Sequence, residues 1–179
     1  MLSAEKLRSL LKHADDPLHL ERPRDFDLQE SARRFAELAS ALENRFGPAC
    51  GSGLYQDASI YGEVEVPAEV AGTRRPLWVQ LSNFGSFVTA GTGSWAEPGP
   101  TEGMTDQFIP WLDATCAAAD CVFVPLDLLL EPYDGPSLLE EAYANEVLSV
   151  LTGDQEEHDE NDGERTLPVV WADRYFNWM

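Results

Sequence analysis

The hydrophobic period of the chain changes at residue 60, and this change constrains the fold more than any other feature. Apolar residues alternate with polar or aromatic ones over residues 60–66 and 77–82, and a short apolar run follows at 87–90. A period of two is typical of half-buried strands. On this pattern one face of the first strand carries Ile60, Gly62, Val64 and Val66. Because short connections with turn residues join the three segments, we expect an antiparallel meander.

Helical periodicity lies on both sides of these strands. It is clearest over residues 28–46, where apolar side chains recur on one stripe. Asp27 and Glu30 have the spacing of a capping box, and Gly47 with Pro48 ends the segment. Further helices are predicted at about residues 3–12, from about Pro110 onward, and over 136–151.

The order helix, meander, helix, strand, helix is typical of α+β proteins. We therefore predict one α+β domain over residues 1–179, with an antiparallel β-meander sheet and helices packed mainly on one face. The apolar run 121–130 predicts a strand that lies at an edge or ends at Pro125. The aromatic segment from Trp171 to the C-terminus fits either a helix or a strand. We expect it to dock into the core, with an exposed aromatic patch as the alternative.

The charge of the chain is unevenly placed. Its formal net charge is −20, and residues 76–164 hold 18 acidic side chains but no lysine or arginine. Such a field opposes binding to nucleic acid or to an anionic membrane. No apolar run is long enough to span a bilayer, the N-terminus lacks the apolar core of a signal peptide, and the three cysteines are an odd number. We therefore expect a cytoplasmic protein.

The densest acidic stretch, a loop at about residues 153–165, has three readings. It could be a solvated linker, because like charges repel and extend a chain. It could attract a basic partner by electrostatics. A calcium loop is the third reading, but aligning Gly163 with the glycine of an EF-hand places His158 and Val169 at ligand positions, where the motif needs carboxylates.

No motif in the chain indicates catalysis or cofactor binding. The glycine pairs at 51–53 and 91–93 lack the frame of a nucleophile elbow or a phosphate loop. His13 and His19 flank a Pro-containing turn, so we read them as polar turn residues, and Cys116 as a buried thiol. We therefore predict no catalytic residue, no cofactor and no metal site.

Several segments together resemble immunity proteins of bacterial polymorphic-toxin and contact-dependent inhibition systems. They are ENRFG, SIYGEVEVP, LWVQLSNFGSFVTAG, EPYDG and a terminal W-x-x-R-Y-F. The resemblance implies a non-enzymatic protein that binds a cognate toxin and covers its active site. Toxins that attack nucleic acid are commonly basic, so the expected partner is a basic effector such as a nuclease.

The candidate partner-binding residues combine aromatic anchors in predicted loops with acids of the charged stretch: Trp95, Glu97, Glu102, Tyr133, Asp134, Glu156, Glu157, Asp159, Glu160 and Asp162. Two alternatives stay open. One is a small hydrolase-type enzyme that uses a carboxylate pair near the Gly/Pro-rich loop at 91–103. The other is a halophile-type acidic domain without a toxin partner, whose charge serves only solvation.

Overall fold

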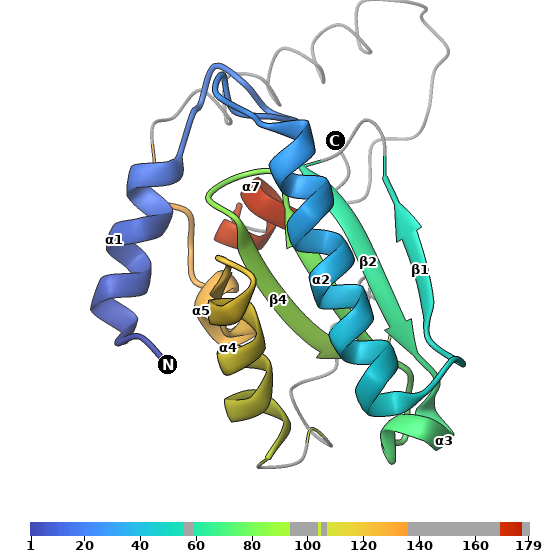
Figure 1. The fold of residues 1–179 in the computed structure, drawn as a ribbon. Coiled ribbons are helices and arrows are strands. Elements are labelled where there is room, and N and C mark those ends of the chain that lie inside the picture. Colours follow the sequence, from blue (N-terminus) through green and yellow to red (C-terminus); the bar gives the residue numbers. More distant parts are fainter. Residues whose placement is uncertain (56–58, 94–103, 105–106, 136–168, 177–179) are drawn as a thin grey trace, which may run out of the picture.

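The predicted α+β class is confirmed by a computed structural model, which describes residues 1–55, 59–93, 104, 107–135 and 169–176 (Figure 1). A five-stranded sheet in the order β1-β2-β3-β4-β5 is the centre of the fold. The predicted helix at 136–151, the Gly/Pro-rich loop and the acidic loop at 153–165 lie wholly or mostly outside the described residues.

The predicted meander is present as β2 (Ile60–Val66), β3 (Leu77–Ser82) and β4 (Phe87–Thr92), joined by antiparallel pairing. The short helix α3 (Ala68–Ala71) lies in the connection between β2 and β3. The strand β1 (Gly51–Leu54) adds antiparallel to β2 and was not predicted. Its sequence GSGL lacks the apolar alternation that indicates a strand.

The fifth strand, β5 (Val122–Phe123), pairs with β4 in parallel, so the sheet is only mostly antiparallel. A parallel pair needs a crossover, and α4 (Phe108–Ala118) lies in that connection. The run 121–130 therefore forms an edge strand that ends before Pro125, as predicted. Pro125 precedes a short helix, α5 (Leu126–Leu129), because proline is favourable at a helix start and cannot donate to a sheet.

The helix predicted at 28–46 is α2 (Leu28–Phe46), with the expected caps. The Asp27 carboxylate accepts from the Glu30 backbone N–H, and Gly47 ends the helix with a φ of 90°. The second contact of a capping box, from the Asp27 N–H to the Glu30 carboxylate, is not among the hydrogen bonds of the described residues. The Glu30 carboxylate pairs instead with Arg33 and Arg34. The cap of α2 therefore also anchors a cluster of surface charges.

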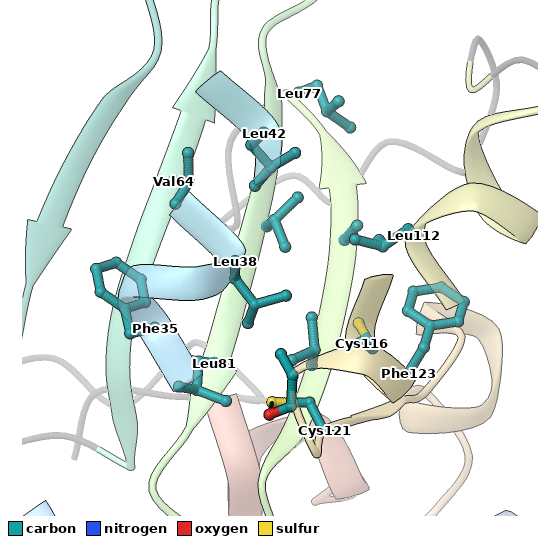
Figure 2. Close-up of a cluster of buried hydrophobic side chains, with 14 of the residues drawn as sticks. Phe35, Leu38, Leu42, Val64, Leu77, Leu81, Leu112, Cys116, Cys121 and Phe123 are labelled. Carbon is teal, nitrogen blue, oxygen red and sulfur yellow. Dashed lines mark hydrogen bonds between the residues drawn. The ribbon is translucent and has the colours of Figure 1, made fainter. Parts of the chain in front are cut away.

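One face of the sheet packs against α2 and α4 (Figure 2). From α2, Phe35, Leu38 and Leu42 enter this core, and Leu112 and Cys116 enter it from α4. The α4 helix begins at Phe108, two residues before the expected start, so Pro110 lies within the first turn. The buried Cys116 agrees with its expected role as a small apolar side chain.

A second cluster packs on the opposite face, where α7 (Trp171–Phe176) lies behind the sheet in Figure 1. The helices α1 (Ala4–Ala14) and α5 contribute to it with Leu7, Leu11, Leu128 and Leu129. The aromatic segment is thus helical, and its Trp171, Tyr175 and Phe176 are buried as expected. Helices therefore cover both faces: α2 and α4 pack on one, and α1, α5 and α7 contribute to the cluster on the other.

Two sequence-based details of the strands are wrong. A register shift between Ile60 and Gly62 moves Ile60 to the second cluster and Tyr61 to the first, so Ile60 does not share a face with Val64. All residues of β3 and β4 are buried, whereas the alternation over 77–82 predicted one exposed face for β3. Polar residues on the second face, such as Gln80 and Thr89, are buried despite their chemistry.

Candidate functional site

Only two of the ten predicted partner-binding residues, Tyr133 and Asp134, lie in the part of the chain that the structure describes. The others fall outside it: Trp95, Glu97, Glu102, Glu156, Glu157, Asp159, Glu160 and Asp162. Their role in binding a partner stays a prediction. The two described residues follow α5, and the structure assigns them different contacts.

Tyr133 makes internal contacts with both its hydroxyl and its ring. The hydroxyl donates to Asp15 Oδ2 at 2.6 Å, and the ring meets Trp171 edge-on at a centroid distance of 4.7 Å. Burial raises the pKa of the Tyr133 hydroxyl, and the Asp15 carboxylate raises it further. Tyr133 is therefore half-buried and engaged in the fold, so any contact with a partner would use only its exposed part.

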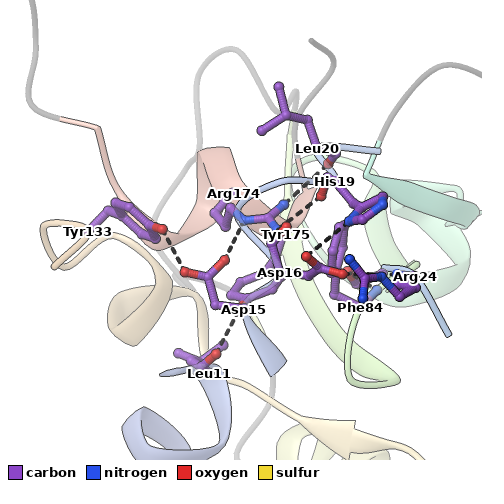
Figure 3. A network of polar contacts seen from close by, with 11 residues as sticks. Leu11, Asp15, Asp16, His19, Leu20, Arg24, Phe84, Tyr133, Arg174 and Tyr175 are labelled. Carbon is purple, nitrogen blue, oxygen red and sulfur yellow. Dashed lines mark hydrogen bonds and ion pairs between the residues drawn. The ribbon is translucent and has the colours of Figure 1, made fainter. Parts of the chain in front are cut away.

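Asp15 belongs to a buried polar network around Arg174, a residue that sequence reasoning passed over (Figure 3). Arg174 is fully buried, Asp15 is 4% exposed, and Arg174 Nε donates to Asp15 Oδ1 at 2.7 Å. The guanidinium group also lies over the Phe84 ring, 4.1 Å from its centroid. A buried charge pair of this kind needs further hydrogen bonds to be tolerated.

Backbone carbonyl groups of the loop after α1 supply those hydrogen bonds. Arg174 donates to the carbonyl oxygens of Asp16, His19 and Leu20 at 2.8, 3.2 and 3.2 Å. Tyr175, the next residue of α7, donates its hydroxyl to the Leu11 carbonyl at 2.6 Å. Together these contacts tie the C-terminal helix to the loop near the N-terminus, and this explains the buried position of the W-x-x-R-Y-F segment.

The network predicts loss of stability at alkaline pH. Burial is the main cause that raises the pKa of both Tyr133 and Tyr175. In the unfolded chain tyrosine titrates near pH ~10. Above that pH the unfolded state loses protons that the folded state keeps, so the free energy of unfolding falls as pH rises. Below pH ~10, the stabilisation from the two buried tyrosines is fully present.

Urea unfolding at intervals between pH 8 and 11.5 measures this effect. We expect the free energy of unfolding to fall above pH ~10 in the wild-type chain and to fall less steeply in the Tyr133→Phe, Tyr175→Phe double variant. An equally steep decline in that variant would contradict the assignment. Circular dichroism at each pH without urea serves as the control that the starting state is folded.

Asp134 is exposed, but Lys12 of α1 neutralises it. Lys12 Nζ lies 2.5 Å from Asp134 Oδ2, and one turn earlier Arg8 makes two hydrogen bonds to Glu131, at 2.7 and 2.5 Å. The Arg8 hydrogen bond is the main cause that holds the pKa of Glu131 below its ordinary value. This corner of the molecule therefore presents paired charges rather than a free acidic surface.

Carboxylate groups that form no ion pair with another described residue occur instead on β2. Strand pairing sets Glu63 opposite Gln80, and Gln80 opposite Thr89, on the sheet face that points away from α2. Gln80 Nε2 donates to one Glu63 oxygen at 2.7 Å, and the Tyr55 hydroxyl donates to the other at 3.4 Å. Burial raises the pKa of Tyr55, and Glu63 adds to this shift. Glu65 follows on the same face and is exposed.

This polar row could have been anticipated only in part. The alternation places Glu63 on the polar side of one strand and Gln80 on the polar side of another. Nothing local in the sequence sets the register that brings these two residues together. We therefore add Glu63 and Glu65 to the candidate partner-binding residues, although the sequence analysis did not select them.

Two cavities of about 250 Å³ each are lined entirely by described residues. One is lined in part by Met104, the residue that follows the Gly/Pro-rich loop in the sequence, and its lining includes Arg45, Thr73 and Gln107 but no Asp or Glu among the described residues. The other lies between α1 and α5 and includes Asp127 and Glu131. The lowered pKa of Glu131 is opposite to the raised pKa that a general acid needs.

Within the described ranges, no group of three or more His, Cys, Asp or Glu residues could hold a metal ion. The same ranges contain no helix that is both long and apolar enough to cross a membrane. Comparisons with models of known protein families, with curated proteins and with solved structures gave no match for this chain. Charge and geometry are thus the observations on which a function can be argued.

Proposed function

We propose that this protein is an acidic immunity protein, which binds a basic toxin and blocks its active site. One observation carries the proposal: the 89 residues from 76 to 164 hold 18 acids and no lysine or arginine. A field of this sign attracts a basic protein and repels nucleic acid, the substrate that a basic nuclease would otherwise engage.

The distribution of ion pairs supports the proposal. Five lysine and arginine side chains pair with carboxylates that also lie in the described part of the chain: Arg8, Lys12, Arg33, Arg34 and Arg174. Carboxylates of the same chain therefore compensate these positive charges. The first 75 residues hold ten of the twelve lysines and arginines, so the basic side chains are concentrated in the first half of the chain.

Electrostatic attraction and tight binding have different physical origins in this scheme. Long-range attraction between opposite charges raises the association rate, up to about 10⁸–10⁹ M⁻¹s⁻¹ at low salt. A smaller contact with buried anchors sets the lifetime of the complex. We expect the acidic stretch at 153–165 to contribute mainly to the first process.

Affinity capture from the native host, with mass spectrometry of the bound proteins at low and moderate salt, tests the proposal. We expect one basic protein to be retained at both salt concentrations. We also expect its toxic activity, measured with the isolated partner, to be inhibited when the purified acidic protein is added. Failure to retain any basic protein at either salt would overturn the proposal. If folding then required molar salt, the charge would serve only to solvate a halophile protein.

Charge reversal tests the part assigned to the acidic loop. Changing Glu156, Glu157, Asp159 and Glu160 to lysine should slow association with the captured partner about tenfold at low salt and flatten its salt dependence. Stopped-flow measurement of the association rate detects the change. An unchanged rate would leave the loop as a solvated linker.

A matched control separates a local effect from an effect of net charge. Four exposed acids of the first half of the chain, changed to lysine, alter the net charge by the same amount: Glu5, Glu21, Asp25 and Glu43. We expect this control variant to slow association less than reversal within the loop. Equal slowing would mean that only the total charge of the protein matters.

A further inference from the structure

Among the described residues, no strand pairs with the outer edge of β1. This strand is first in the order of the sheet, and all four of its residues are exposed, with Leu54 64% exposed. Its sequence, GSGL, has no lysine, no proline and no other charged residue. Natural proteins usually protect such edges with charges, prolines or bulges, because an open edge can pair with another chain.

The direction of the backbone groups on this edge follows from the pairing with β2. Tyr55 N–H donates to the Tyr61 carbonyl at 3.1 Å, and strand residues alternate in the side to which their backbone groups point. Residues 51 and 53 therefore bond to β2. The N–H and C=O groups of Ser52 and Leu54 point away from the sheet, ready to pair with an added strand.

We infer that this edge binds an extended, basic segment of the partner protein as a sixth strand. The inference rests on the proposed function, because it assumes a basic protein partner. Backbone hydrogen bonds to Ser52 and Leu54 would supply binding that depends little on sequence. Specificity would come from the side chains that flank the edge.

Carboxylates on β2 make the edge selective for basic segments. Gly51 pairs with Glu65, and Gly53 pairs with Glu63, so both carboxylates lie on the same face as the two glycines. Because glycine has no side chain, nothing on β1 separates these acids from an incoming strand. An added strand would lie two strand spacings, about 10 Å, from β2. A lysine or arginine side chain of that strand and a glutamate side chain of β2 can together bridge this distance.

The two carboxylates differ in how they are held. Glu63 accepts from Tyr55 and Gln80, so its position is fixed before any partner arrives. Glu65 is exposed and can rotate toward an incoming basic side chain. On the opposite face of β1, the exposed Leu54 offers an apolar contact to the same segment. The expected ligand therefore alternates basic and apolar residues.

Pairing of this edge with a second copy of the chain is disfavoured by the same charges. Two β1 strands side by side would leave Glu63 and Glu65 of the two copies three strand spacings apart, about 14 Å, in molecules that each carry a net charge of −20. Repulsion between the two net negative charges opposes this pairing. A basic partner relieves this repulsion, whereas a second copy adds to it.

The probe for the test is the synthetic peptide Lys-Val-Lys-Val-Lys-Val, with Glu-Val-Glu-Val-Glu-Val as its acidic counterpart. We expect the basic peptide to slow amide hydrogen exchange at Ser52 and Leu54, measured by NMR, and the acidic peptide to leave it unchanged. Slowed exchange elsewhere, with none at these two amides, would overturn the inference.

Two pairs of variants locate the binding. Ser52→Pro removes an outward N–H without removing a bond to β2, and it should weaken binding of the basic peptide at least tenfold, whereas Ser52→Ala should not. Glu65→Lys should weaken binding more than Glu69→Lys, which changes net charge equally at an exposed site on α3. Equal effects within both pairs would overturn the inference.

The captured partner separates failure of this inference from failure of the proposed function. If the partner binds Ser52→Pro as tightly as the wild type, the protein is still an inhibitor but uses another surface. If no basic partner is captured and the peptide also fails to protect Ser52, both ideas fall. Dimer formation by the wild type that Ser52→Pro abolishes, measured by analytical ultracentrifugation, would instead assign the edge to a second copy and overturn the inference.

Discussion

Replacing Arg174 with methionine is expected to lower the free energy of unfolding by about 3–5 kcal/mol, the usual cost of removing one partner of a buried ion pair. Asp15, only 4% exposed, would keep its charge without the guanidinium group that compensates it. Three backbone carbonyl groups of the loop after α1 would also lose their donor. Urea unfolding followed by circular dichroism measures the loss.

An exposed pair of the same chemistry is the control. Arg8 and Glu131 also form a close arginine–carboxylate pair, but their side chains are 43% and 38% exposed. Arg8→Met should therefore cost much less stability than Arg174→Met, because water compensates the remaining charge. Equal costs for the two substitutions would contradict the role assigned to burial.

A double variant tests the physical cause of the Arg174 effect. If the uncompensated Asp15 charge is responsible, then changing Asp15 to leucine together with Arg174→Met should restore part of the lost stability. A double variant that is less stable than Arg174→Met would indicate that the hydrogen bond from Tyr133 to Asp15 matters more than the charge.

Replacing Gly62 with alanine is expected to cost about 1–3 kcal/mol, because the added methyl group has no room. A Cβ atom at this position would lie 2.8 Å from the Gly53 carbonyl oxygen and 2.8 Å from a ring atom of Phe35. The first neighbour is backbone of β1, and the second belongs to the core side of α2. Neither can move far without loosening an adjacent element.

Gly53→Ala is the matched control, because a Cβ atom at Gly53 would have nothing within 4 Å. Since alanine also reduces the freedom of the unfolded chain, we expect little change or a small gain in stability. Urea unfolding gives the stabilities, and NMR shifts of the β1 amides report whether the edge strand has moved. Equal stability of the two variants would contradict the close packing at Gly62.

The periodicity of the sequence was sufficient for the elements that depend on local interactions. The stripe of α2 and the alternation in β2 and β3 each repeat a signal over several residues, so the prediction of these elements is confirmed. The strand β1 has only two glycines, a serine and a leucine, and it becomes a strand because β2 offers it an edge. The local sequence of β1 therefore does not predict that it pairs with β2.

The candidate partner-binding residues were less predictable than the fold. Acidic character was visible from composition, yet Asp134 is neutralised by Lys12, 122 residues away in the chain, while Glu63 and Glu65 lie beside an open edge. Tyr133 looked like a loop anchor, and its hydroxyl instead donates to Asp15, 118 residues away. Which charges and aromatic groups are free depends on pairings across such long separations.

By itself, the sequence determined the α+β class, the helix boundaries set by Asp27 and Gly47, and a negative field concentrated after residue 75. These properties follow from the period of the side chains, from capping and from summed charge, all of which act locally or add without regard to position. Only the tertiary structure decided the register that joins Glu63 to Gln80 and the burial of Arg174 against Asp15, 159 residues apart. Such contacts depend on the packing of whole elements, because a pair distant in sequence meets only when every element between them is in place.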